Sequence, residues 1–119
     1  MIINIPISIG ELLDKITILE IKSMFIDDEY VLKELESLNL IKSTLTQYTL
    51  EYEIQLRKVN EKLWKIEDKL RQLEKEKRFD DEFIELARSV YMTNDERARI
   101  KKEINEKYNS YYKEIKVHK

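Results

Sequence analysis

The chain has 119 residues, of which 42% are hydrophobic and 39% are charged, and it contains one glycine and one proline. A chain of this length forms one domain, and so little glycine and proline favours amphipathic helices over sheets and turns. The net charge of -2 predicts no nucleic-acid surface, and the lack of cysteine excludes disulfides and thiol catalysis. The single histidine, His118, lies one residue before the last, so histidine catalysis and histidine-based zinc binding are not expected.

The first seven residues are rich in β-branched isoleucine and contain the proline, Pro6. This composition predicts a short extended arm over residues 1–7. We expect the arm to pack across the rest of the domain, and pairing with a second copy of the chain is the alternative. The stretch is too short to span a membrane and lacks the basic start and cleavage site of a signal peptide, so we expect a cytoplasmic protein without membrane contact.

A capping-box pattern follows the arm at residues 8–11. Ser8 can accept a hydrogen bond from the amide three residues further on while Glu11 reaches back, which predicts a helix from there to about Phe25. Apolar residues lie on more than one side of this helix, so we expect it to be well buried. Glu11 also has a potential partner in Lys15, one helical turn away.

The region from residue 27 to residue 77 carries one long helical pattern. The segment Asp27-Asp28-Glu29 offers an N-cap, and the apolar residues from Val31 to Leu73 keep one heptad phase. Taken literally, this phase gives a helix of about 47 residues and about 70 Å, which a compact chain of this size cannot cover. Weak helix formers cluster between Ser43 and Thr49, so we predict a break there and an antiparallel pair of helices near 28–43 and 49–77. One unbroken helix in a dimeric coiled coil is the alternative.

Two further helices are predicted after residue 77. The cations at residues 75–78 suit the C-terminal end of the preceding helix, and Asp80 caps the next one, whose apolar face runs from Phe79 to Tyr91. Residues 93–96 form a second capping box, which predicts a tight corner before a fifth helix. The predicted architecture is an all-α, antiparallel, bundle-like domain of five helices over residues 1–119, with a short extended arm.

The only tryptophan, Trp64, lies near the middle of the chain on a helix with two different faces. Apolar residues from Val59 to Leu73 recur at spacings of four and three and form one face. Trp64 lies about 140° from the centre of that face, among charged and amide side chains that include Asn60 and Glu67. Because an exposed tryptophan would leave a large apolar surface in water, we expect a second element to cover this side. This Trp-centred face, with ionic and amide groups around the ring, is the best candidate for a site.

Three ordered motifs run through the chain. They are Ile5-Pro6-x-Ser8-x-Gly10-Glu11-Leu12-x-Asp14-Lys15, then Asn60-x-x-Leu63-Trp64-x-Ile66-Glu67-Asp68, then Ala87-Arg88-Ser89-Val90-Tyr91-x-Thr93-Asn94-Asp95-x-Arg97-Ala98-x-Ile100-Lys101. With them the chain resembles a family of small bacterial and phage-encoded proteins that is catalogued only as a domain of unknown function. The likeness covers nearly the whole chain and is poor only at the tail from Ile115 and in the middle, near residues 40–55. The resemblance implies an all-helical cytoplasmic protein and carries no activity with it.

The ligand-binding candidates are polar and aromatic residues on the Trp-centred face and around the predicted corner. They are Asn60, Trp64, Glu67, Asp68, Arg88, Tyr91, Asn94, Asp95, Arg97, Lys101 and Asn105. The adjacent carboxylates Glu67 and Asp68 offer hard oxygen ligands for a divalent cation, or a general base. The structural alternative pairs Glu67 with Arg71 and leaves Asp68 in solvent or at a cap. No catalytic residue, metal or cofactor is assigned by these patterns.

A second group of candidates surrounds the predicted corner. Arg88, Arg97 and Lys101, together with free amides at the start of a fifth helix, are interpreted as a phosphate or carboxylate site. Asp95 and Glu96 count against this interpretation because they already occupy that helix end. A solvated Arg88 is the structural alternative.

Two asparagines within predicted helices, Asn60 and Asn105, cost helix propensity and therefore need a reason. They are either buried amides that fix the register between helices or contacts to a ligand. Glu11, Asp14 and Lys15, in the first turns of the first helix, are interpreted as capping and pairing residues.

Two classes of function remain. The preferred class is a non-enzymatic binding or assembly module, because the chain has no glycine-rich loop, no cysteine and a single histidine. Such a module would bind a protein partner or another copy of itself through the Trp-centred face or through Tyr108, Tyr111 and Tyr112. Core packing is the alternative role for these tyrosines.

The second class is a small all-helical enzyme or binder that acts on a phosphorylated or nucleotide-like small molecule. In that hypothesis Glu67, Asp68 and Asp95 hold Mg²⁺ while Arg88 and Lys101 hold the anion.

Overall fold

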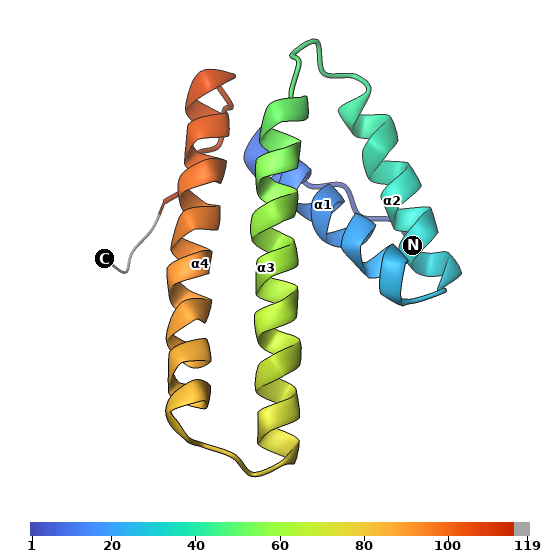
Figure 1. Ribbon diagram of the computed structural model, residues 1–119. Coiled ribbons are helices and arrows are strands. Elements are labelled where there is room, and N and C mark those ends of the chain that lie inside the picture. The colour runs from blue at the N-terminus through green and yellow to red at the C-terminus, as the bar shows by residue number, and fades with distance from the viewer. Residues whose placement is uncertain (116–119) are drawn as a thin grey trace.

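The structure is a computed structural model, and it describes residues 1–115 (Figure 1). Four α-helices account for most of these residues: α1 (Ile9–Phe25), α2 (Glu29–Lys42), α3 (Leu50–Lys75) and α4 (Asp81–Lys107). No strand occurs within residues 1–115, so the all-α prediction is confirmed there. None of the described helices combines the length and the apolar character that a membrane crossing needs. His118 lies outside the described residues.

The helices α3 and α4 run antiparallel side by side and form the longest part of the molecule (Figure 1). One half of this hairpin packs against α1, which contacts both of its helices, and the half next to the α3–α4 connection extends beyond α1. Within residues 1–115, α2 packs on α1 and meets α3 through the ion pair of Lys42 with Glu53 at 2.7 Å, so α2 and α3 do not pack along each other as the predicted antiparallel pair. All three other helices therefore meet α1, which positions the polar side chains described below.

The apolar core lies where α1 crosses the hairpin. It consists of side chains from all three helices: Leu13, Leu56, Val59, Ile100 and Ile104. The apolar side chains of α1 are buried on several sides, as predicted, since they face α2 as well as the hairpin. Each fully buried aliphatic side chain contributes about 1.5–3 kcal/mol, so this cluster holds α1 firmly on α3 and α4.

The predicted N-caps of α1, α2 and α4 are confirmed. The side chains of Ser8, Asp28 and Asp80 accept hydrogen bonds from the backbone amides of Glu11 (3.1 Å), Tyr30 (2.8 Å) and Phe83 (3.3 Å). These bonds satisfy amides that have no partner inside the first helical turn. The predicted pairing of Glu11 with Lys15 is wrong, because the Glu11 carboxylate lies 2.8 Å from the ammonium group of Lys101 on α4.

The predicted break in the long heptad pattern is confirmed, and the alternative of one unbroken helix is wrong. The helix α2 ends at Lys42 and α3 begins at Leu50. The hydroxyls of Ser43 and Thr44 donate to the backbone carbonyls of Leu40 and Ile41, each at 2.6 Å. Side-chain bonds of this kind compete with the helical backbone ladder, which is why serine and threonine favour helix ends.

The predicted corner at residues 93–96 does not exist, so the fold has four helices and not five. Thr93 is buried, and it continues the apolar stripe of α4 between Val90 and Ile100 at helical spacing. The Asn94 side chain accepts a hydrogen bond from Arg97 and caps no helix. Without a glycine or proline in this segment, a capping-box sequence does not by itself end a helix.

The N-terminal arm has no regular secondary structure and runs beside α1 and α2. Its isoleucines form one wall of a groove of about 390 Å³, and Leu38, Ile41 and Leu45 line the opposite side. The arm therefore lies beside its own domain but is not buried against it, since Ile2, Ile3 and Ile5 are 68–88% exposed, and its pairing with a second copy stays a prediction.

Candidate functional site

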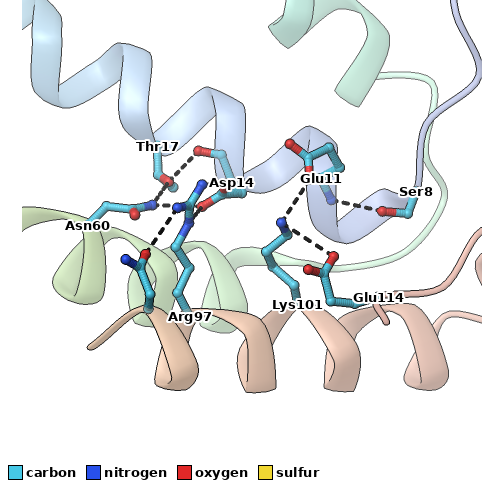
Figure 2. A network of polar contacts seen from close by, with 9 residues as sticks. Ser8, Glu11, Asp14, Thr17, Asn60, Arg97, Lys101 and Glu114 are labelled. Carbon is cyan, nitrogen blue, oxygen red and sulfur yellow. Dashed lines mark hydrogen bonds and ion pairs between the residues drawn. The ribbon is translucent and has the colours of Figure 1, made fainter. Parts of the chain in front are cut away.

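A buried carboxylate stands at the point where α1, α3 and α4 meet. Asp14 of α1 is completely buried, and it faces Arg97 of α4 and Asn60 of α3 (Figure 2). The Arg97 guanidinium donates through Nε to Asp14 Oδ1 at 2.9 Å and through Nη2 to Asp14 Oδ2. The Asn60 amide donates to Asp14 Oδ1 and to Thr17 Oγ1, both at 2.9 Å. A buried charge is tolerated only with such partners, so these bonds join three helices at one point.

The bonds to Asp14 also determine the state of Arg97. The hydrogen bond and the charge of Asp14 raise the pKa of Arg97 by more than its partial burial lowers it, so the guanidinium stays charged. Its third nitrogen, Nη1, donates to Asn94 Oδ1 at 3.4 Å. Arg97 is thus held in one orientation from both sides.

Lys101, one turn further along α4, forms a second charged cluster (Figure 2). Its Nζ lies 2.8 Å from Glu11 Oε2 and 3.4 Å from Glu114 Oε2, and only 9% of its side chain is exposed. Burial lowers the pKa of Lys101, but the hydrogen bond of Glu11 and the charges of Glu11, Asp14 and Glu114 outweigh it and leave the pKa raised. Lys101 therefore stays protonated, and its positive charge is balanced by the carboxylates of Glu11 and Glu114.

The predicted anion site is not assembled. Arg97 and Lys101 are paired with three carboxylates, those of Asp14, Glu11 and Glu114. Arg88 is exposed, and it lies nine residues before Arg97, which places it on roughly the opposite side of α4. The free helix-end amides of the prediction are absent because α4 continues through that position.

Asn105 has a structural role at the start of α1. Its Oδ1 accepts a hydrogen bond from the amide of Gly10 at 2.8 Å, and the amide of Ile9 donates to Ser110 Oγ at 3.1 Å. A Cβ atom on Gly10 would lie 2.8 Å from the backbone oxygen of Lys101, so glycine permits this close approach of α1 to α4. The alternative in which Asn105 fixes the register between helices therefore matches its contacts.

The same junction opens into a groove of about 300 Å³, which we call the Trp64 groove. It is lined by Ile18, Ile21, Lys22, Asn60, Leu63, Trp64, Glu67, Asn94 and Arg97. Five of the residues singled out from the sequence thus come together: Asn60, Trp64, Glu67, Asn94 and Arg97. That they bind a ligand stays a prediction.

Trp64 is covered by a second element, as expected, but its surroundings are only half polar. The end of α1 lies over it, and the Phe25 ring stacks on the indole with centroids 5.1 Å apart and an interplanar angle of 14°. One side of the ring therefore faces apolar groups, and the other faces the amides of the groove. Trp64 Nε1 is buried and has no hydrogen-bond partner among the described residues.

The remaining candidates lie elsewhere. Asp68 on α3 and Tyr91 on α4 are exposed, and Asp95 lines a different depression next to Arg99. Within residues 1–115 no three acidic or histidine side chains form a group that could hold a metal, so the Mg²⁺ site expected from Glu67, Asp68 and Asp95 does not form. The alternative ion pair of Glu67 is also not formed within these residues, since no salt bridge joins it to Arg71.

Sequence reasoning missed the burial of Asp14, the hydrogen bond of Thr17 with Asn60 and the place of Lys22 in the lining of the groove. The sequence interpretation groups Asp14 with the capping and pairing residues, although it lies between Leu13 and Ile16 on a helix that is apolar on several sides. A carboxylate in that setting must be buried and therefore requires a cation, which is the signal that identifies it.

A comparison of the chain with known protein families covers all of the positions described above. Residues 3–119 match the family described as "Family of unknown function (DUF6165)". No curated protein and no solved structure matches the chain. The matched range includes every residue of the Asp14 contacts and of the Trp64 groove. The chain therefore belongs to this family of unknown function, DUF6165.

Proposed function

We propose that the protein is a non-enzymatic binding module and that the Trp64 groove is its binding site. The observation that carries this proposal is the lining of the groove, which combines an apolar floor with an indole and two asparagine amides. Binding sites typically have such a mixture, with much apolar surface and a few placed polar groups.

The polar groups of the groove are held in place before any ligand arrives. Asn60 is fixed through its Nδ2 by Asp14 and Thr17, which leaves its Oδ1 as the unused acceptor (Figure 2). Arg97 is fixed by Asp14 and Asn94. Fixed side chains lose little conformational entropy on binding, so the arrangement favours affinity.

The same contacts count against catalysis by the paired charged groups of the junction. General acid or base catalysis needs an ionisable group that can exchange a proton in reach of the substrate. The charged groups of the junction, Asp14, Arg97 and Lys101, are paired with one another or with Glu11 and Glu114. Both cations have raised pKa values, which holds their protons more firmly.

A second candidate function is self-association, and α2 favours it. This helix has no buried residue, and Leu32, Leu40 and Ile41 are each more than half exposed. Of these three, Ile41 lines the arm–α2 groove beside the isoleucines of the arm, whereas Leu32 lies on roughly the opposite side of α2. A two-fold interface needs a surface that complements itself, and an aliphatic surface of this kind is suited to it.

The single tryptophan provides the test of binding in the groove. We would record the indole N–H resonance and the melting temperature of the whole chain with a panel of blocked amino acids, free amino acids, nucleotides, sugar phosphates and Mg²⁺. At least one class should move the resonance and raise the melting temperature, because a ligand of the native state stabilises it. Asn94→Leu should abolish the effect, and Asn39→Leu on exposed α2 should preserve it. A panel without any response would overturn the proposal.

A further inference from the structure

A second, smaller hollow lies on the other side of Trp64. It measures about 150 Å³ and is lined by Ile21, Met24, Phe25 and Trp64, with Glu61 and Lys65 at its border. We call it the Phe25 slot. An apolar cavity of about 150 Å³ has room for a group the size of benzene, which is the scale of one large apolar side chain.

The slot and the Trp64 groove adjoin each other, because Ile21 and Trp64 line both. A ligand that crosses the indole would therefore place an apolar group in the slot and a polar part in the groove. The shape of the two hollows together suits an amphipathic ligand whose apolar and polar parts are separated by the width of one ring.

The free hydrogen-bonding groups near the groove are neutral. Trp64 Nε1 is a buried donor without a partner among the described residues, and the cost of such a group is removed when a carbonyl accepts from it. Asn60 retains a free acceptor, Oδ1, and Asn94 retains a free donor, Nδ2, because their other ends are bonded to Asp14 and Arg97. Two donors and one acceptor match the carbonyl and N–H groups of a peptide backbone.

The charges around the two hollows are balanced. Lys22 and Glu67 lie at the groove, and Lys65 and Glu61 lie at the slot. This balance favours a neutral ligand over a phosphorylated one, since the nearby Arg97 is already neutralised by Asp14. An acyl chain would need a longer apolar channel than the slot offers.

We infer that the Trp64 groove and the Phe25 slot bind an extended polypeptide segment of a partner protein. One apolar side chain of the segment fills the slot, and its main-chain amides bond to Trp64, Asn60 and Asn94. The inference rests on the proposed binding function and specifies its ligand.

N-acetyl-leucinamide is the probe, because it carries one apolar side chain between two amides. Added to the isotope-labelled full chain, it should move the indole N–H resonance downfield and saturate with a Kd of about 10 mM, as expected for so few ligand atoms. N-acetyl-glycinamide, which lacks the side chain, and isoamyl alcohol, which lacks the amides, should each bind about tenfold more weakly. Equal binding of all three would overturn the inference.

Two variants locate the binding. Met24→Glu places a charge at the slot and should abolish the response to N-acetyl-leucinamide. Met92→Glu is the matched control, because Met92 is similarly exposed (58% against 64% for Met24) but lies on α4 away from both hollows, and it should leave the response unchanged. A response that survives Met24→Glu overturns the role of the slot.

The ligand panel distinguishes failure of this inference from failure of the proposed function. If another class of the panel moves the indole resonance while the blocked amino acid does not, the peptide inference fails and the binding function stands. If no class moves the resonance, the inference and the binding function both fail.

Discussion

The Asp14 carboxylate on α1 accepts hydrogen bonds from two nitrogens of the Arg97 guanidinium on α4, 83 residues further along the chain. This pair fixes the rotation of α1 on the hairpin and, through Asn60, the position of the groove amides. The stability of the fold and the geometry of the proposed site therefore depend on the same side chains.

Replacing Arg97 should show how much the stability of the fold depends on its pairing with Asp14. Arg97→Met leaves the Asp14 charge buried with only an amide partner, and we expect a loss of about 3 kcal/mol in the free energy of unfolding. The value lies at the low end for buried pairs because 28% of the Arg97 side chain is exposed. Urea unfolding measures it. The double variant Asp14→Leu with Arg97→Met should recover much of the loss; strictly additive losses would contradict the pairing.

Asn60→Asp should destabilise the protein in a pH-dependent way. It replaces the amide donor with a second carboxylate beside Asp14, and we expect a loss of about 3 kcal/mol at neutral pH. Mutual repulsion raises the pKa of such a pair, so the penalty is present above the raised pKa and disappears as the pH falls towards about 4. Unfolding curves across this range measure the change. Asn60→Leu serves as the control, and its loss should not vary with pH.

Gly10→Ala should destabilise the protein although alanine is the better helix former. The new Cβ would meet the Lys101 backbone oxygen at 2.8 Å and Asn105 Oδ1 at 2.9 Å, so α1 must move away from α4. We expect a net loss of about 1–3 kcal/mol, against a gain of up to about 1 kcal/mol from helix propensity alone. Ser37→Ala on exposed α2 measures the propensity gain without a clash. An increase in melting temperature for Gly10→Ala would refute the close approach.

Lys101 should contribute stability that is lost at alkaline pH. Burial lowers its pKa, but Glu11 and its neighbouring carboxylates raise it above the ordinary value of 10.5. A group whose pKa is raised on folding stabilises fully below its unfolded pKa and loses that contribution as the pH rises through the folded pKa. The difference in unfolding free energy between the wild type and Lys101→Gln should therefore shrink above pH 10.5. A difference that stays constant there would contradict the ion pairs.

Self-association should depend on α2. Ile41→Glu introduces a charge at the arm–α2 groove and should reduce the mass measured by light scattering at high protein concentration. Tyr111, which is 88% exposed, provides a second surface, whereas Tyr108 packs against the core; Tyr111→Ala should also weaken association. Both variants change exposed positions, so each should retain the wild-type stability to within about 0.5 kcal/mol. A monomer for the wild type at every concentration would exclude this function.

Local chemistry made several features of the fold predictable. The caps at Ser8, Asp28 and Asp80 involve oxygens and amides two or three residues apart, so the sequence contains the whole interaction. The same pattern at Thr93 was misleading because burial of that side chain against the core outweighs its capping preference. A capping box predicts a helix start only where the surrounding chain can leave the helix.

Contacts between distant residues were not predictable in the same way. Asp14 needs a cation, but the chain has 22 lysines and arginines, and nothing local selects Arg97 among them. The Trp64 environment was predictable in part: periodicity places Asn60 and Glu67 beside it, whereas the stacking of Phe25 depends on where α1 ends over α3.

The contacts at the start of α1 determine the order in which the fold can be built. The hydrogen bonds from Ile9 and Gly10 to Ser110 and Asn105 close loops of 101 and 95 residues, whereas α3 and α4 are joined by a short connection. Long loops cost more entropy to close, so the hairpin should form before α1 docks on it. Among the four described helices, α1 is the most apolar, is synthesised first and docks last, so its apolar side chains stay exposed until the hairpin has formed.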